Sequence, residues 1–224
     1  MILKSMQRNG LILAGFAVIA TFLVVMTSLL TEDEIERQQQ QELLRVLNQI
    51  IPASKHDNDL YDSCTLISHP DLGVQPRRVY RALVDGQPTA AAMEVTAPNG
   101  YSGAIHLLVA MNVDGSVAGV RTLQHQETPG LGDKIELRKN NWILSFNGHR
   151  VNGTDDNRWA VKRDGGMFDQ FTGATITPRA VVQAVKRAAL VFNNQQQAWF
   201  NAPANCQAPA GSVVNSTDTV GEPQ

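Results

Sequence analysis

The hydrophobic and polar positions divide this chain into stretches of clearly different character. From Gly10 to Leu30 the sequence contains no charged residue and is rich in Leu, Ile, Val, Ala and Phe. A run of this length can cross a bilayer as one helix. We therefore predict a transmembrane anchor over residues 1–31. A cleaved signal peptide is the alternative, but the sequence from Thr27 to Glu32 matches a small-x-small cleavage site poorly.

The charges that flank this apolar run differ in sign. Lys4 and Arg8 precede it, and four acidic residues follow it: Glu32, Asp33, Glu34 and Glu36. Basic flanks of membrane helices stay on the cytoplasmic side. The pattern predicts a cytoplasmic N-terminus and places the rest of the chain on the far side of the membrane.

Residues 32–51 continue with helical spacing of apolar positions, up to Pro52, which ends the predicted helix. The apolar positions of this stripe are Ile35, Leu43, Leu44, Leu47, Ile50 and Ile51. We interpret residues 32–52 as an amphipathic stalk that docks on the following domain. A helix that binds a partner is the alternative.

Two Asp-Gly turns organise the middle of the chain. Asp85-Gly86 joins strand-like runs at residues 77–83 and 90–96, and Asp114-Gly115 joins runs at 104–111 and 117–123. Asp-Gly between such runs is a strong hairpin signal. Further along, residues 133–141 have the pattern of a short helix and residues 158–162 that of another strand.

A long helix is predicted after these strands. Its apolar positions recur at helical spacing in Val181, Val185, Ala188 and Phe192. Thr177 is a good N-cap residue and Pro178 suits the first helical position. Strands followed by a late helix predict an α+β domain with an antiparallel sheet over residues 53–202. The composition of residues 203–224 predicts a flexible C-terminal tail.

Composition excludes several classes of function. The net charge is −2, from 19 basic and 21 acidic residues, and no basic stripe supports nucleic-acid binding. Cys64 and Cys206 are the two cysteines, either joined as a disulfide in an oxidising compartment or present as two isolated thiols. Their spacing predicts neither a metal site nor an iron–sulfur site. We find no acid, base or nucleophile constellation for a soluble substrate, and no Rossmann glycine fingerprint.

The most informative stretch is Asp-Gln-Phe-Thr-Gly-Ala-Thr-Ile-Thr-Pro at residues 169–178. Thr175 lies just before the predicted helix, where free N–H groups and the helix dipole favour a phosphate. Gly173 permits close approach of the backbone and Ala174 adds little bulk. A threonine hydroxyl is a weak nucleophile, so its modification needs an activating enzyme.

A second stretch, residues 125–134, contains Pro129-Gly130 and therefore predicts a tight turn. Leu131 and Gly132 follow with an apolar face and free backbone, while Glu127 and Thr128 supply hydrogen-bonding groups. A plain surface turn is the alternative. His125 and Glu127 have no third ligand nearby in the sequence, so a metal site is not supported.

These residues carry a resemblance to a known family. Asp169, Thr172, Gly173, Ala174, Thr175 and Thr177 match the D-x-x-[S/T]-G-A-[S/T]-x-[S/T] motif of FMN-binding domains, and residues 125–132 resemble its H-x-E-T-P-G-L-G segment. Gly100-Tyr101-Ser102-Gly103 also resembles a family segment, which we interpret as a turn. The resemblance implies that a flavin transferase joins FMN to Thr175 as a phosphoester. Lys162 is then either a counter-charge for that phosphodiester or a solvated lysine.

The resemblance covers roughly residues 80–192. The family includes the G subunit of the bacterial Rnf (or Rsx) complex and the C subunit of the Na+-translocating NADH:quinone reductase, and the shortness of the chain favours the former. It implies an electron-transfer subunit of a redox-driven ion-translocating complex, with its FMN domain on the periplasmic side of the inner membrane. A non-redox assembly module and a secreted ligand-binding domain are the alternatives.

Overall fold

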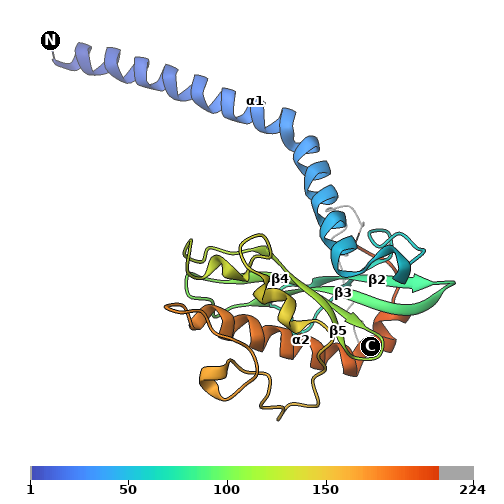
Figure 1. Cartoon of the computed structure of the whole chain (residues 1–224). Helices are drawn as coiled ribbons and strands as arrows, with labels where there is room; N and C mark the ends of the chain where they lie inside the picture. The colour runs from blue at the N-terminus through green and yellow to red at the C-terminus, as the bar shows by residue number, and fades with distance from the viewer. Residues whose placement is uncertain (1, 207–224) are drawn as a thin grey trace, which may run out of the picture. The chain divides into compact units, whose positions relative to one another are not determined.

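The computed structural model describes residues 2–206. Figure 1 shows a long N-terminal helix, a sheet and a second long helix. The elements, in chain order, are α1 (Ile2–Ile50), η1 (Ala53–Lys55), β1 (Cys64–Ile67), β2 (Arg77–Val84), β3 (Gln87–Ala97), β4 (Ile105–Asn112), β5 (Val117–Gln124), η2 (Asp133–Ile135), η3 (Asn141–Phe146), η4 (Lys162–Asp164) and α2 (Ile176–Asn201). Of the tail predicted over residues 203–224, residues 207–224 lie outside the described residues.

Helix α1 runs without a break through the predicted anchor and stalk. Its stretch Met6–Glu32 has a mean hydropathy of 2.4, and is long and apolar enough to span a membrane. The helix ends at Ile50, ahead of Pro52. Residues from Val46 onward belong to the same compact unit as the sheet, and Leu47, Ile50 and Ile51 are buried there. The end of the predicted stalk therefore docks, whereas Ile35 is exposed.

The sheet has the order β1-β2-β3-β4-β5, and every neighbouring pair is antiparallel. Both predicted hairpins are confirmed. Asp85 and Gly86 have φ values of 50° and 73°, which suit a two-residue turn whose twist matches that of the strands. The predicted α+β class with an antiparallel sheet is therefore correct.

The two faces of the sheet bury different side chains. Val79, Met93, Val109 and Val120 align across β2 to β5 and join the main core with α2. On the opposite face the neighbouring row is Tyr80, Ala92, Ala110 and Gly119. A Cβ at Gly119 would lie 2.8 Å from Ile50 Cγ2, so the small residues make room for the end of α1.

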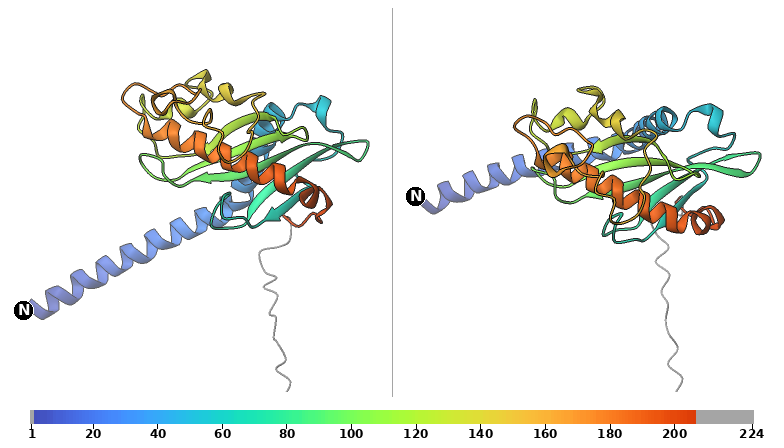
Figure 2. Two further views of the ribbon diagram at one scale, coloured as in Figure 1. Left: turned by 90° about the horizontal axis from the view of Figure 1, so that it is seen from below. Right: turned by 60° about the horizontal axis from the view of Figure 1, so that its bottom comes forward.

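Helix α2 lies along one face of the sheet, as both views in Figure 2 show, and its closest strands are β3 and β4. The chain between β5 and α2 contains only short 3-10 turns and loops. Its aromatic residues complete the core: Trp142, Phe146, Trp159, Phe168 and Phe171 are all buried. This irregular segment thus supplies five large buried side chains to the main core.

The C-terminal end of α2 is fastened by a buried arginine and a disulfide. Arg81 Nη1 donates to the carbonyl oxygens of Trp199, Phe200 and Ala202, which satisfies carbonyls that a helix end leaves unpaired. Cys64 and Cys206 are joined as a disulfide, so the alternative of two isolated thiols is wrong. The segment after α2 is thereby attached to the edge strand β1.

Two predicted elements differ from the structure. Residues 133–141 do not form one helix, because the Asn140 side chain accepts the Trp142 N–H and starts a separate 3-10 turn. Residues 158–162 form no strand: Val161 makes an isolated bridge with Phe168. There the chain folds back so tightly that a Cβ at Gly166 would lie 2.0 Å from the Ala160 carbonyl oxygen.

Candidate functional site

The two motif segments meet at one cavity of about 290 Å³, at the N-terminus of α2. Three loops form it: the one after β3, the one after β5, and the one that leads into α2. Its lining residues are Tyr101, Glu127, Thr128, Leu131, Gly132, Gly173, Ala174, Thr175, Ile176 and Thr177. Segments that lie far apart in the sequence, and that were singled out separately, are therefore walls of one site.

Thr175 stands at the N-cap position of α2, since the helix begins at Ile176. Its φ and ψ are −80° and −28°, and its side chain makes no capping hydrogen bond. The turn before it is closed by the Ala174 N–H, which donates to the Phe171 carbonyl oxygen at 3.1 Å. Gly173 has a φ of 81° in this turn, a conformation that favours glycine. The half-buried Thr175 is thus presented at the cavity with its hydroxyl uncommitted to capping.

Thr177 has a different role from the predicted one. It lies inside the first turn of α2 and is fully buried, so it is not the N-cap. Its Oγ1 donates a hydrogen bond to Glu127 Oε2. Pro178 accordingly follows two residues into the helix instead of occupying the first helical position. The prediction failed because the partner of Thr177 lies on a distant loop.

Glu127 connects the three walls of the cavity. Its side chain is 4% exposed, and Oε1 accepts the Ser102 N–H at 3.0 Å, while Oε2 accepts the Thr177 hydroxyl. A buried carboxylate requires such donors. Both oxygens of Glu127 therefore already bind protein groups, and the residue holds the loop after β3 against the start of α2.

Two glycines make this arrangement possible. A Cβ at Gly132 would lie 2.9 Å from Glu127 Cβ and 3.1 Å from Thr177 Oγ1. A Cβ at Gly100 would lie 2.8 Å from Glu127 Oε1. All three distances are shorter than ordinary contacts, so a side chain at either position would crowd the buried carboxylate.

A histidine supports the loop from outside the cavity. The Glu127 N–H donates to His125 Nδ1 at 3.0 Å, which leaves the ring proton on Nε2, 2.8 Å from Glu136 Oε1. The hydrogen bond from Arg138, followed by that from His125, lowers the pKa of Glu136. His125 is therefore a positioning group for Glu127. No cluster of three metal-ligating side chains occurs among residues that the structure describes.

Large apolar side chains form the open rim of the cavity. Tyr101, Leu131 and Ile176 are 68%, 42% and 45% exposed, and together they give the mouth of the cavity an apolar surface. Tyr101 and Ile176 were not among the predicted site residues. The Gly-Tyr-x-Gly segment gave a signal for Tyr101, although we interpreted it as a turn. Ile176 gave none beyond an apolar residue at the start of a helix.

Two of the predicted site residues, Thr172 and Lys162, do not line the cavity. Lys162 Nζ lies 2.6 Å from Asp169 Oδ1, and both side chains are more than half exposed. The Asp169 carbonyl oxygen accepts the Trp142 indole N–H at 2.7 Å. Arg179 contacts both carboxylate oxygens of Asp164, at 2.6 and 2.8 Å. These contacts fix the loop that carries Thr175.

Two family models match the chain. Residues 100–190 match the model of the FMN-binding domain, and residues 1–50 match that of the RnfG N-terminal region. The matched span of the FMN-binding domain contains every residue that lines the cavity.

Three relatives align over almost their full length. The chain is 53% identical over 205 residues to a protein of Vibrio atlanticus, covering 91% of this chain and 98% of the relative. It is 54% identical to a protein of Shewanella baltica, covering 91% and 97%. It is 51% identical to a protein of Aliivibrio fischeri, covering 92% and 99%. Each is named as the G subunit of an ion-translocating oxidoreductase complex.

The matches also account for the apolar helix. Relatives that are named as members of an ion-translocating complex, together with a helix able to span a bilayer, support membrane anchoring of this chain. The FMN-binding domain supports an electron-transfer role for a flavoprotein. With identity above half over nine-tenths of its length, the chain belongs to the G-subunit family of ion-translocating oxidoreductase complexes.

Proposed function

We propose that this chain carries FMN as a phosphoester on Thr175 and relays electrons between other subunits of an ion-translocating oxidoreductase complex. The observation that carries the proposal is the position of Thr175. Its hydroxyl lies at the wall of a cavity, at the N-cap of a 26-residue helix, without a capping hydrogen bond. A phosphate is favoured at such a helix end by backbone N–H groups and by the helix dipole.

The cavity fits a flavin nucleotide in its chemistry. Leu131, Tyr101 and Ile176 offer apolar surface for a planar ring system, and the exposed Thr128 offers a hydroxyl to a polar chain. Gly173 and Ala174 line the cavity with little side-chain bulk. Glu127 and Thr177 shape the wall through their buried hydrogen bond. Bound FMN would supply one- and two-electron chemistry, and the protein would set its position and local field.

The attachment itself would be a phosphoryl transfer. Thr175 Oγ1 forms a bond to the phosphorus of an activated FMN donor, the bond from phosphorus to the leaving group breaks, and the hydroxyl proton departs with that group. A flavin transferase would supply the donor and activate the hydroxyl, because threonine alone is a poor nucleophile. Asp169 and Thr172 are exposed on the same loop, where the transferase would contact them. Lys162 would orient that loop through Asp169.

We further propose an orientation in the bacterial inner membrane. Lys4 and Arg8 precede the apolar stretch and acidic residues follow it, which favours a cytoplasmic N-terminus. The segment 32–52 would then be a stalk, and residues 53–202 the periplasmic FMN domain. The disulfide between Cys64 and Cys206 supports this side of the membrane, since disulfides persist in oxidising compartments.

In-gel fluorescence tests the proposal. Full-length chain produced together with its flavin transferase should give a fluorescent band after denaturing electrophoresis, and Thr175→Ala should give a dark one. Thr172→Ala is the matched control, because Thr172 is a threonine outside the cavity wall. This variant should change only the efficiency of flavin transfer. Flavin that is released on denaturation would indicate a non-covalent binding domain instead. Protein without flavin in any state would indicate an assembly module.

A further inference from the structure

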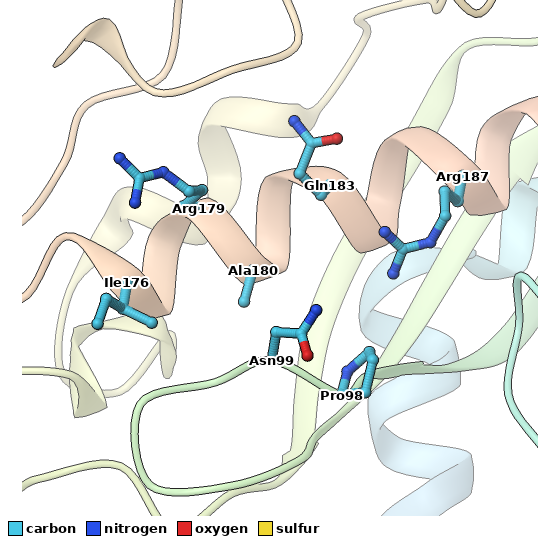
Figure 3. Close-up of a pocket in the computed structure, with 7 residues that line it drawn as sticks. All are labelled: Pro98, Asn99, Ile176, Arg179, Ala180, Gln183 and Arg187. Atoms are coloured by element: carbon cyan, nitrogen blue, oxygen red, sulfur yellow. The ribbon is translucent and has the colours of Figure 1, made fainter. Parts of the chain in front are cut away.

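A second cavity, of about 280 Å³, adjoins the proposed flavin site, and Figure 3 shows the residues that line it. Its lining residues are Pro98, Asn99, Ile176, Arg179, Ala180, Gln183 and Arg187. Ile176, Ala180, Gln183 and Arg187 recur at helical spacing and form one face of α2. Pro98 and Asn99 directly follow β3 and form the opposite wall. Ile176 lines both cavities, so they adjoin at this residue.

Arg179 and Gln183 are already engaged with other parts of the protein. Arg179 forms its paired contact with Asp164, and Gln183 Nε2 donates to the Trp159 carbonyl oxygen at 3.0 Å. In Figure 3 both side chains point away from the loop that carries Asn99. They tie α2 to the segment before it and leave the cavity to the other lining residues.

Arg187 and Asn99 are not engaged in this way. Their polar ends point into the space between α2 and the loop (Figure 3). Among the side chains that the structure describes, the half-buried Arg187 has no ion-pair partner and the Asn99 side chain has no hydrogen-bond partner. No acidic residue lines the cavity. An unpaired guanidinium beside an unpaired amide is suited to a carboxylate, which can accept from both groups.

We propose that this cavity binds an acidic side chain of a partner subunit and thereby docks that subunit against the flavin site. The proposal rests on the function proposed above. Its polar end offers one guanidinium and one amide, which suits a single carboxylate side chain. Pro98, Ala180 and Ile176 offer apolar surface for the residue that flanks the carboxylate. A partner held here would lie beside the proposed flavin site, since Ile176 lines both cavities.

Charge reversal in the native membrane complex tests the docking. With Arg187→Glu we expect at least a tenfold loss of sister subunits that co-purify, and a matching fall in electron transfer through the complex. In-gel flavin fluorescence and the melting temperature of the chain should stay at wild-type values. Arg163→Glu is the matched control, because Arg163 is exposed and does not line the cavity. Arg187→Gln should give a smaller loss, since it removes the charge without reversing it.

Photo-crosslinking identifies the occupant. A benzophenone amino acid in place of Asn99 should cross-link to a peptide of a sister subunit that contains Asp or Glu. The cross-link should weaken at least tenfold in the Arg187→Glu background. Replacing the cross-linked acid by Lys should restore assembly of that variant.

Several results would overturn the proposal. These are an unchanged complex with Arg187→Glu, a cross-link to a peptide without an acidic residue, or a cross-link to lipid alone. If wild-type protein gave a band without flavin, the proposed function would be refuted. The cross-linking result would still report on the docking independently. If Arg187→Glu lowered the melting temperature of the chain along with its assembly, Arg187 would stabilise the fold. The docking proposal would then be wrong.

Discussion

Thr177 donates a buried hydrogen bond to Glu127 from a position 50 residues further along the chain. The two residues belong to different motif segments, and their hydrogen bond holds the loop after β5 against the first turn of α2. Glu127 also accepts the Ser102 N–H, so this contact joins all three walls of the proposed flavin cavity. The shape of the site therefore depends on a hydrogen bond that does not itself touch the reactive hydroxyl.

Removing the Thr177 hydroxyl should destabilise the domain. Thr177→Val keeps the volume of the side chain but leaves a buried carboxylate oxygen without its donor. We expect a loss of about 1.5–3 kcal/mol in the free energy of unfolding, the range for hydrogen bonds to charged groups. Urea unfolding of the unflavinylated full-length protein in detergent measures it.

Thr177→Ser is the control for that experiment. Serine keeps the hydroxyl and should retain most of the stability. Equal losses in the two variants would show that the methyl group, and not the hydrogen bond to Glu127, stabilises the start of α2.

Gly132→Ala should disturb the cavity through crowding alone. Gly132 has an ordinary backbone φ of −83°, so alanine brings no conformational strain. Its Cβ would instead lie 2.9 Å from Glu127 Oε2, and overpacking of this kind costs about 1–3 kcal/mol. We expect lower stability and a lower yield of flavin attachment, measured by unfolding and by in-gel fluorescence.

Gly130→Ala separates crowding from backbone strain. Gly130 has a φ of 78° and open space at its Cβ position, so alanine there strains the backbone without touching Glu127. Its stability should fall by about 1–2 kcal/mol, and flavin attachment should remain near the wild-type level. An equal loss of attachment in both variants would contradict the role given to Gly132.

Loss of the disulfide should destabilise the domain strongly. Cys64 and Cys206 are separated by 142 residues, and removing a bridge from a small exported domain costs about 2–5 kcal/mol. Cys64→Ser, Cys206→Ser and the double variant should unfold at the same lowered urea concentration. A double variant as stable as the wild type, or no effect of a reductant, would contradict the structural role of this bridge.

The ion pair of Glu136 predicts a loss of stability in acid. Arg138 and His125 hold the pKa of Glu136 below its usual value. A carboxyl group with a lowered folded pKa contributes stability above its unfolded pKa of about 4.3, and loses it as the pH falls through that value towards the folded one. Stability should therefore decline below about pH 5, and less steeply in Glu136→Gln. Identical pH profiles for the two proteins would exclude this contribution.

The sequence predicted the elements whose signals are local. Asp85-Gly86 and Asp114-Gly115 fix their hairpins by turn chemistry, and the apolar spacing from Val181 to Phe192 defines α2. Strand β1 was missed because it has only four residues and is held at the edge of the sheet by Asn205 and the disulfide. The path of residues 133–168 depends on aromatic packing between distant positions, which no local pattern encodes.

The candidate site also had parts that the sequence could predict and parts that it could not. The resemblance to a known family predicted that the two motif segments belong to one site, and most of their residues line the cavity. Two features had no local signal: the hydrogen-bond partner of Thr177 and the position of Ile176 in the rim. Both arise only from the contact of the loop after β5 with α2. For Lys162 the motif left a counter-charge and a solvated lysine open, and its exposed side chain pairs with Asp169 outside the cavity.

Intact-mass spectrometry of the full-length protein, made together with its flavin transferase, tests the central claim most directly. The wild-type chain should exceed the mass of its amino acids by one FMN less one water, and fragmentation should locate this addition on Thr175. Thr175→Ala should have the unmodified mass and the same melting temperature as unflavinylated wild-type protein. A wild-type chain that weighs only the sum of its amino acids, or an addition that persists in Thr175→Ala, would contradict the account.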